Sequence, residues 1–351
     1  MSSNQKPVLL YFHPGMASFI RKDLAIIEQE WRIILFEFRQ DQKQLVLLDF
    51  LRQFVFLFQH IWISKRIVCQ FGGYHSLLPA VFGRIFRIPV WMILGGYDCY
   101  SFPEIKYGAF HKKWFGKIVG YSYQLADLLS PVHESMVDHP YSYYPSGYPN
   151  QGFQFFLPHL KTKVETIHNG YEPNKFRDLH KSRIPNSFLT VARDTAGSTY
   201  FRKGIDLILE AAPHFPHFQF TIIGKNKDQE ISIPSNIRFL PPVPYEELQQ
   251  IYNDHEFYLQ LSIAEGFPNA LSEAMLCGCI PIGSDVFGIP DLIGDTGLIL
   301  KHRDIQELIA LFSGLDGLDK KGLSENARKR VSEKFNLKLR EQKMLQVLRE
   351  L

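Results

Sequence analysis

The stretch SIAEGFPNALSEAMLCGCIPIGSDVFGIPD, residues 262–291, is the most informative part of this chain. The apolar run 257–261 before it predicts a strand, and Asn269 to Leu276 has the spacing of a helix. Pro268 stands where the first helical turn tolerates a missing N–H. The free N–H groups of Asn269 and Ala270 are then expected to point back toward the strand end. A helix start of this kind is suited to a phosphate.

Two carboxylates belong to the same stretch. Glu265 lies in the predicted loop, and Glu273 follows eight positions later, one turn inside the predicted helix. An ionised carboxylate at such a place needs hydroxyl or cationic partners, and sugar and ribose hydroxyls supply them. We therefore interpret the pair as a binding site for a glycosylated nucleotide.

Two cations are expected to face the same site. Arg193 and Lys203 flank a loop rich in Gly, Ser and Thr, between a predicted strand at 188–192 and a helix that starts at Gly204. Open α/β folds bind ligands beyond the carboxyl ends of their strands, where both side chains would lie. A diphosphate between these cations and the Asn269 helix start is the simplest interpretation.

Working outward, short apolar runs alternate with segments of helical period along the whole chain. This alternation predicts βα units around parallel sheets, so the fold class is α/β. The 351 residues exceed what one core usually covers and favour two domains. The irregular segment 141–160 and a boundary near 170–184 divide the two series, and residues 324–351 predict a charged helix, kinked at Phe335-Asn336.

Composition and missing motifs exclude several classes of protein. With 45% hydrophobic and 21% charged residues the chain is folded rather than disordered, and a net charge of +3 is too small to argue for nucleic acid. The apolar stretch 54–63 is interrupted and short, so no membrane span is expected. Dinucleotide, P-loop, nucleophile-elbow and zincin signatures are missing, as is any Asp-x-Asp pair, and we expect no metal. The four cysteines are predicted to be reduced core residues.

The motifs together resemble a known family. EGFPNALSEAM, followed by Gly278, Pro281 and GIPD, resembles the donor site of retaining glycosyltransferases of family 4 (group 1). VARDTAGSTYFRKG resembles that family's Arg…Lys-Gly phosphate loop, and HNGYEPNKF resembles its interdomain segment. The resemblance implies a GT-B fold, in which two Rossmann-like domains face a cleft. It also places domains at 1–168, for the acceptor, and 169–330, for the nucleotide sugar, with a C-terminal helix at 331–351 packing back on the first.

Residue roles follow from the resemblance by position. Glu265 would bind hydroxyls of the transferred sugar and Glu273 those of the ribose, while Arg193 and Lys203 would neutralise the departing diphosphate. The other donor-binding positions implied are Gly15, Gly224, Val243, Gly266, Phe267, Pro268, Asn269 and Ala270. The front-face mechanism usual for the family needs neither an enzyme nucleophile nor a metal. The nucleotide diphosphate sugar is then a co-substrate and no cofactor is expected.

Two departures from the family pattern leave alternatives open. The ten positions between Arg193 and Lys203 exceed the usual loop, so Arg202 is a rival for the phosphate role. Many family members carry a His after the fourth strand of the first domain, where this chain has LGGYD at 94–98. Asp98, which we include among the catalytic residues, or Tyr97 is expected to face the acceptor instead.

The first half of the chain is basic. Residues 51–125 contain nine Lys or Arg and two acidic residues, among them Lys112, Lys113 and Lys117, interleaved with Phe110, Trp114 and Phe115. This pattern suits either an interfacial segment that meets anionic lipid or a solvated helix with a buried aromatic side. We expect a cytoplasmic protein, with peripheral contact at the inner membrane face as the alternative.

These observations predict a retaining, metal-independent glycosyltransferase of the hexosyltransferase type. Its partners would be a nucleotide-sugar donor and a glycan or lipid-linked acceptor, in surface polysaccharide assembly. Two alternatives stay open at this point: another GT-B enzyme, such as a nucleotide-sugar epimerase, and a non-catalytic nucleotide-sugar binding protein.

Overall fold

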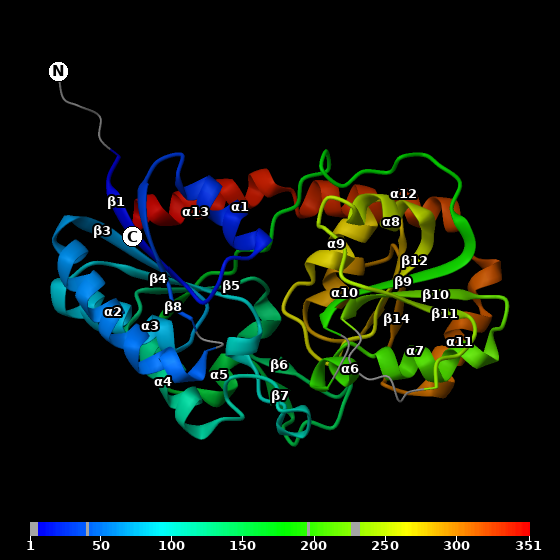
Figure 1. The fold of residues 1–351 in the computed structure, drawn as a ribbon, viewed down its shortest axis with the longest axis horizontal. Coiled ribbons are helices and arrows are strands. Elements are labelled where there is room, and N and C mark those ends of the chain that lie inside the picture. The colour runs from blue at the N-terminus through cyan, green and yellow to red at the C-terminus, as the bar shows by residue number, and fades with distance from the viewer. Residues whose placement is uncertain (1–5, 40–41, 195–196, 226–231) are drawn as a thin grey trace.

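Two parallel sheets organise the chain (Figure 1). The computed structural model describes residues 6–39, 42–194, 197–225 and 232–351. The first sheet has the strand order β2-β1-β3-β4-β5-β8, and the second has the order β11-β10-β9-β12-β13-β14. We call each sheet with its covering helices the first unit and the second unit. The α/β class predicted from the sequence is confirmed.

The first unit runs from β1 to β8. Its sheet strands are β1 (Val8–His13), β2 (Arg32–Glu37), β3 (Ser64–Gln70), β4 (Val90–Leu94), β5 (Leu128–Pro131) and β8 (Lys163–Val164). Its helices are α1 (Ser18–Ile27), α2 (Val46–His60), α3 (Tyr74–Phe86), α4 (Lys113–Leu125) and α5 (Phe153–Phe156). The strands β6 (His139–Pro140) and β7 (Asn150–Gln151) form a small antiparallel pair inside the segment that we predicted to be irregular.

Alternate residues of β1 explain why both faces of the first sheet are covered. Leu9 and Tyr11 pack with residues of α1 and α13, whereas Leu10 and Phe12 pack toward α2 and α3. Figure 1 shows the same layers, with α1 and α13 on one side of the sheet and α2, α3 and α4 on the other. A strand buried on both faces is continuously apolar, as β1 is.

The second unit repeats the pattern. Its strands are β9 (Ile184–Asp194), β10 (Gln219–Lys225), β11 (Ile237–Leu240), β12 (His255–Gln260), β13 (Ile280–Ser284) and β14 (Leu298–Leu300). Its helices are α6 (Ser198–Arg202), α7 (Ile205–Ala211), α8 (Leu248–Asp254), α9 (Asn269–Leu276), α10 (Gly288–Ile293), α11 (Ile305–Ser313) and α12 (Lys320–Lys334). Because β9 and β12 are neighbours, the loops that follow them meet at one edge of the sheet.

The chain returns to the first unit at its end. Helix α12 packs on α9, the chain breaks at Phe335-Asn336, and α13 (Leu337–Glu350) packs on α1. Arg340 of α13 forms a buried ion pair with Asp23 of α1, with 2.7 Å between Nη2 and Oδ2. The kink predicted at Phe335-Asn336 therefore separates two helices on different units. The domain bounds at 168 and 330 stay predictions.

Helix α2 exposes an unusual amount of apolar surface. The segment Val46–Ile63 is long and apolar enough to cross a membrane by length and composition alone, with a mean hydropathy of 1.4 over 18 residues. Our estimate from 54–63 was therefore too short. In the structure α2 buries Asp49, Gln53 and Leu57 against its own unit and leaves the opposite side open. Its eighteen-residue segment is only 22% buried.

Candidate functional site

The loop between β12 and α9 brings Glu265 to the carboxyl edge of the second sheet. Pro268 is the cap residue before α9, one position earlier than we expected, and the helix begins at Asn269. Asn169 reaches this loop from the interdomain segment, and its amide donates to the Phe267 carbonyl oxygen at 3.2 Å. The free amides at the start of α9 therefore lie at the junction of the two units.

Glu265 accepts contacts from two cations. Its Oε1 lies 2.5 Å from Lys203 Nζ and 3.2 Å from Arg202 Nη1, and the Ser262 hydroxyl donates to the same oxygen at 3.2 Å. Burial would raise the pKa of Glu265, but the charges of Lys203 and Arg202 outweigh it and hold that pKa below its usual value. Burial also lowers the pKa of Lys203, which Glu265 partly offsets. An anionic Glu265 thus balances two cations packed beside it.

Arg202 joins the site more clearly than the sequence suggested. Its guanidinium contacts Glu265, donates to the Ala264 carbonyl oxygen at 3.3 Å and lies 4.8 Å from the centroid of the Tyr107 ring in the first unit. Arg193 ends β9, but its side chain lies outside the described residues. The structure therefore brings Arg202 to Lys203 and Glu265, and the role assigned to Arg193 stays a prediction.

Glu273 is buried and held by tyrosines. Tyr245 donates to its Oε1 at 2.8 Å and Tyr252 to its Oε2 at 3.5 Å, and the residue is 4% exposed. Burial raises the pKa of Glu273 to about 7, against the opposing effect of the Tyr245 hydrogen bond. The sequence analysis missed both tyrosines, because Tyr245 belongs to a loop after β11 with no motif of its own. A ribose at Glu273 would have to share the carboxylate with Tyr245.

This raised pKa predicts a pH-dependent stability. Glutamate has a pKa of about 4.3 when unfolded, so folding favours the protonated carboxyl. The stability that protonation contributes is present below about pH 4.3, falls as pH rises, and is lost above pH 7. Glu273→Gln, which mimics the neutral form, should stabilise the protein by about 3 kcal/mol at pH 8 and little at pH 4. Denaturant unfolding at both pH values measures this.

The exposed Glu333 of α12 supplies the matched control for that experiment. Glu333→Gln should change the free energy of unfolding by less than about 0.5 kcal/mol at either pH. An equal effect of Glu273→Gln at pH 4 and pH 8 would show that Glu273 titrates normally.

The remaining predicted donor positions lie around the same edge. Gly224 is buried near the end of β10, and Val243 is half-buried in the loop after β11. Gly15 follows β1 with φ +150°, and nothing lies within 4 Å of where a Cβ would stand. This open turn faces no described side chain at that point, which leaves room for a ligand near the first unit. Contacts of these residues with a donor stay predictions.

Asp98 organises a loop of the first unit. It is 1% exposed, and its carboxylate accepts from the backbone N–H groups of Gly72, Gly95 and Gly96 at 2.9–3.1 Å and from the Tyr123 hydroxyl at 3.1 Å. Burial raises the pKa of Asp98, which these hydrogen bonds oppose. The contacts give Asp98 a positioning role in the loop, whereas Tyr97, the alternative from the sequence, is half-buried.

A cavity of about 180 Å³ opens beside this loop. It is lined by Pro14, Phe71, Gly72, His75, Gly95, Tyr97, Asp98 and Tyr107. His75 is buried there and its pKa falls to about 4 because burial disfavours the charged ring. The first unit thus presents a small cavity with a neutral imidazole close to the Gly95 loop. Sequence reasoning gave no signal for His75, because it looked for a histidine after β4.

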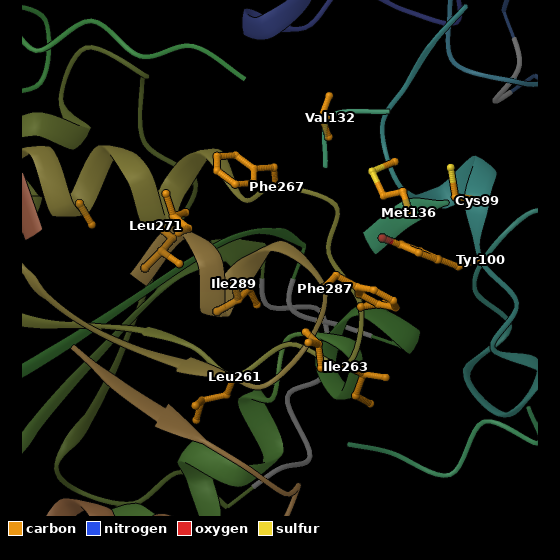
Figure 2. Packing of buried hydrophobic residues seen from close by; sticks show 14 of the residues in the cluster. Cys99, Tyr100, Val132, Met136, Leu261, Ile263, Phe267, Leu271, Phe287 and Ile289 are labelled. Atoms are coloured by element: carbon orange, nitrogen blue, oxygen red, sulfur yellow. The ribbon is translucent and has the colours of Figure 1, made fainter. Parts of the chain in front are cut away.

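The two units touch through apolar residues and one close backbone approach. Figure 2 shows Val132, Met136 and Tyr100 of the first unit opposite Phe267 and Phe287 of the second. The Tyr100 and Phe287 rings stack with centroids 4.1 Å apart. A Cβ on Gly266 would stand 2.5 Å from the Gly95 carbonyl oxygen, so only glycine allows this approach. The Glu265 loop is therefore pressed against the first unit.

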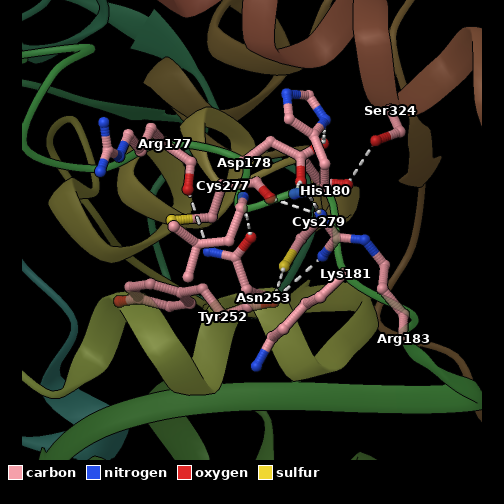
Figure 3. A network of polar contacts seen from close by, with 12 residues as sticks. Arg177, Asp178, His180, Lys181, Arg183, Tyr252, Asn253, Cys277, Cys279 and Ser324 are labelled. Atoms are coloured by element: carbon pink, nitrogen blue, oxygen red, sulfur yellow. Dashed lines mark hydrogen bonds and ion pairs between the residues drawn. The ribbon is translucent and has the colours of Figure 1, made fainter.

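A second polar network lies away from the strand ends of the site. Figure 3 shows Arg183 and Asn253 at its centre, where Arg183 donates to the carbonyl oxygens of Tyr252 and His255 and Asn253 donates to that of Arg177. A cavity of about 400 Å³ adjoins it. The donors and acceptors here bind backbone, so this network holds the chain in place. All four cysteines are buried and unpaired, as predicted.

The comparisons with known proteins agree with this geometry. Residues 191–315 match the family model for glycosyl transferases group 1. The amylovoran biosynthesis glycosyltransferase AmsK of Erwinia amylovora is 28% identical over 54% of this chain and 51% of its own length. The Schizosaccharomyces pombe phosphatidylinositol N-acetylglucosaminyltransferase gpi3 subunit is 24% identical over 50% of this chain and 41% of its own. The chain spans about half or less of the length of these relatives.

Solved structures match along almost the whole chain. Sucrose-phosphate synthase from Thermosynechococcus elongatus superposes with a TM-score of 0.72 at 15% identity, covering 99% of both chains. Anabaena HepE, solved with UDP and glucose, superposes with a TM-score of 0.69 at 17% identity, covering 98% of this chain and 100% of its own. The predicted GT-B fold and the resemblance to group 1 glycosyltransferases are confirmed.

Proposed function

We propose that this chain, a GT-B protein with a group 1 glycosyltransferase domain over residues 191–315, transfers a sugar from a nucleotide diphosphate donor to a glycan or lipid-linked acceptor. The observation that carries the proposal is the meeting of Lys203, Arg202 and Glu265 beside the free amides of α9. Two cations and a helix start form a site for a diphosphate. One carboxylate beside them can accept sugar hydroxyls.

The charge distribution suits departure of a diphosphate. As the glycosidic bond breaks, negative charge grows on the leaving phosphate and positive charge grows on the sugar. Lys203 and Arg202 stabilise the first, and the ionised Glu265 faces the second. Preorganised charges in a partly dry site stabilise such a transition state strongly. In our proposal the sugar keeps its anomeric configuration, the acceptor attacks from the face of the departing diphosphate, and the chain supplies no nucleophile and no metal to the diphosphate.

A calorimetric titration tests donor binding. UDP, GDP and ADP and their glycosylated forms should be titrated into the wild-type chain with and without Mg²⁺. We expect one nucleotide to bind selectively, with the same affinity in both conditions. An affinity that requires Mg²⁺ would contradict metal-independent binding, and lack of binding across the panel would contradict the donor site.

Transfer must be measured separately from binding. Incubation of the selected donor without acceptor should release neither an epimer nor free sugar above background, and adding acceptor should produce a glycoside. An epimer without acceptor would favour an epimerase. Selective binding without product for any glycan or lipid-linked acceptor would favour a binding protein.

We also propose that the acceptor side meets an anionic membrane through the α2–α4 face. We define this face as the exposed apolar residues Leu47, Leu48, Leu51, Phe54, Val55, Phe58, Trp62, Ile63, Ile85 and Trp114. Trp62 is 68% and Trp114 is 75% exposed, and exposed Arg84, Lys113 and Lys117 lie on the same helices or beside them. Aromatic and aliphatic groups bordered by cations are typical of a surface that enters the lipid interface.

A groove adjoins this face. It has a volume of about 540 Å³ and is lined by Leu35, Phe36, Glu37, Leu51, Arg52, Val55, Phe56 and Gln59, between β2 and α2. Such a groove next to a lipid surface suits the acyl or prenyl chain of a lipid-linked acceptor. The groove and the apolar face therefore support the lipid-linked class over a free glycan.

Vesicle sedimentation measures this contact. We expect stronger binding to vesicles of phosphatidylglycerol than to phosphatidylcholine. Phe58→Ser with Trp62→Ser should weaken binding to both by about 100-fold, because each apolar side chain contributes roughly 1.5–3 kcal/mol when buried. Lys113→Gln with Lys117→Gln should remove the preference for the anionic lipid.

Leu339→Ser is the matched control, since Leu339 is 44% exposed on α13, outside the α2–α4 face. Its vesicle binding should equal that of the wild type. If the Phe58/Trp62 variant instead abolished a concentration-dependent dimer and left vesicle binding unchanged, the apolar face would be a protein interface.

A further inference from the structure

Four potential metal ligands from separate parts of the chain converge where the units meet. We call His133, Glu134, His168 and Asp291 the interunit cluster. His133 and Glu134 follow β5, His168 belongs to the segment after β8, and Asp291 lies in α10 of the second unit. One ligand atom from each side chain lies within 4.8 Å of all the others. The mixture of two imidazoles and two carboxylates is a donor set that zinc uses.

His133 supplies an independent sign that something is bound. The residue is 4% exposed, and its Nε2 has no hydrogen-bond partner among the described residues. Its Nδ1 lies 2.8 Å from the Ser135 hydroxyl oxygen and 3.2 Å from the Ser135 backbone nitrogen. When Nδ1–H donates to the hydroxyl, Nε2 presents a lone pair to the cluster. A buried, unpartnered ring nitrogen is costly unless a ligand satisfies it.

The distances fit a metal better than direct hydrogen bonds. His133 Nε2 lies 3.5 Å from both Glu134 Oε1 and Asp291 Oδ2, and His168 Nε2 lies 3.3 Å from Glu134 Oε2. Hydrogen bonds from nitrogen to oxygen are usually about 2.7–3.2 Å. Zinc bonds of about 2.0–2.2 Å in a tetrahedron place neighbouring ligand atoms about 3.3–3.6 Å apart. The observed separations lie in the second range.

Surrounding residues already orient the ligands. The Phe267 ring stacks against both imidazoles, with centroids 5.7 Å from His133 and 5.4 Å from His168. Arg330 Nη2 lies 3.5 Å from Asp291 Oδ1, while Oδ2 faces His133. Ser135 fixes the His133 ring from the other side. Outer contacts of this kind hold metal ligands in place.

We propose that the interunit cluster binds one Zn²⁺ ion. Three ligands come from the first unit and its link to the second, and the fourth comes from α10, so the ion joins the units across the cleft. None of the cluster residues is a cation that we assign to the diphosphate, so the site can be tested whether or not the chain transfers sugar. A bound ion would restrain the Phe267 loop, which leads into the start of α9.

Zinc affinity is measured on the full chain. Protein stripped with EDTA and freed of chelator is titrated with Zn²⁺ in competition with a chromophoric chelator. We expect one equivalent to bind and the melting temperature to rise. His168→Gln and Asp291→Asn should each weaken binding by more than about tenfold, since loss of even an outer contact costs 10–100-fold. Both side chains are partly exposed, at 31% and 45%, so the variants should fold.

His302 supplies the matched control. It is exposed, and its Nδ1 lies 2.9 Å from Glu307 Oε2, with no second imidazole in its contact. His302→Gln should bind zinc like the wild type. Co²⁺ gives a further readout, because tetrahedral Co²⁺ absorbs visible light more strongly than octahedral Co²⁺, and we expect that spectrum to disappear in His168→Gln. Lack of one-to-one binding, or equal affinity in the cluster variants and the wild type, would overturn the proposal.

Discussion

Replacing Lys203 with alanine should lower the rate of sugar transfer by about 10²–10³-fold, the typical cost of losing one preorganised charge or donor at a developing anion. Lys203 is 15% exposed in its side chain and lies 2.5 Å from Glu265, so it is held before the donor arrives. Its ammonium group would stabilise the leaving diphosphate more than the bound donor. We therefore expect kcat to fall more than the affinity for the donor.

Lys301 provides the control for this experiment. It also pairs with a carboxylate, Asp285, at 3.2 Å, but it is 61% exposed at the surface. Lys301→Ala should leave transfer unchanged. Lys203→Arg keeps the charge and should recover part of the rate. If Lys203→Ala transferred sugar at the wild-type rate, Lys203 would have no part in the reaction, and Arg202 would carry the diphosphate alone.

The layout of the fold could be predicted because each strand is apolar enough to identify. The run at β1 is buried on both faces, and the turns between strands and helices carry Gly and Pro. The meeting of Lys203 with Glu265 also followed from the pattern, since β9 and β12 are neighbours in a parallel sheet and their loops share an edge. The length of the apolar segment at α2 was underestimated because Gln53 and His60 fall on its buried or half-buried side.

The rest of the site depends on packing between distant segments. Arg202 reaches Glu265 because α6 begins one turn before Lys203, and Tyr245 reaches Glu273 from another loop. Asp98 has the composition of a reactive residue, yet four hydrogen bonds hold it inside its loop. No spacing rule along the chain predicts these contacts. The interunit cluster likewise needs β5, the segment after β8 and α10 to be brought together.

Replacing Glu265 with glutamine should separate nucleotide binding from transfer. The carboxylate balances Lys203 and Arg202 in the free protein, and both contacts are made by its Oε1. Glutamine keeps the shape but leaves two cations unbalanced, so a nucleoside diphosphate should bind at least as tightly as it binds the wild type. A neutral amide accepts weaker hydrogen bonds from sugar hydroxyls and offers no charge to the cationic sugar, so transfer should fall by about 10²–10³-fold.

Calorimetry with the nucleoside diphosphate and an initial-rate assay with saturating donor measure these two effects on the same preparation. Removing one partner of a buried ion pair can destabilise a protein by about 3–5 kcal/mol, so the melting temperature must be recorded as well. Adding the nucleoside diphosphate should restore more stability to Glu265→Gln than to the wild type, because the phosphates then supply the missing negative charge. Equal loss of binding and transfer would instead mean that Glu265 organises the site only by holding Lys203 and Arg202 in place.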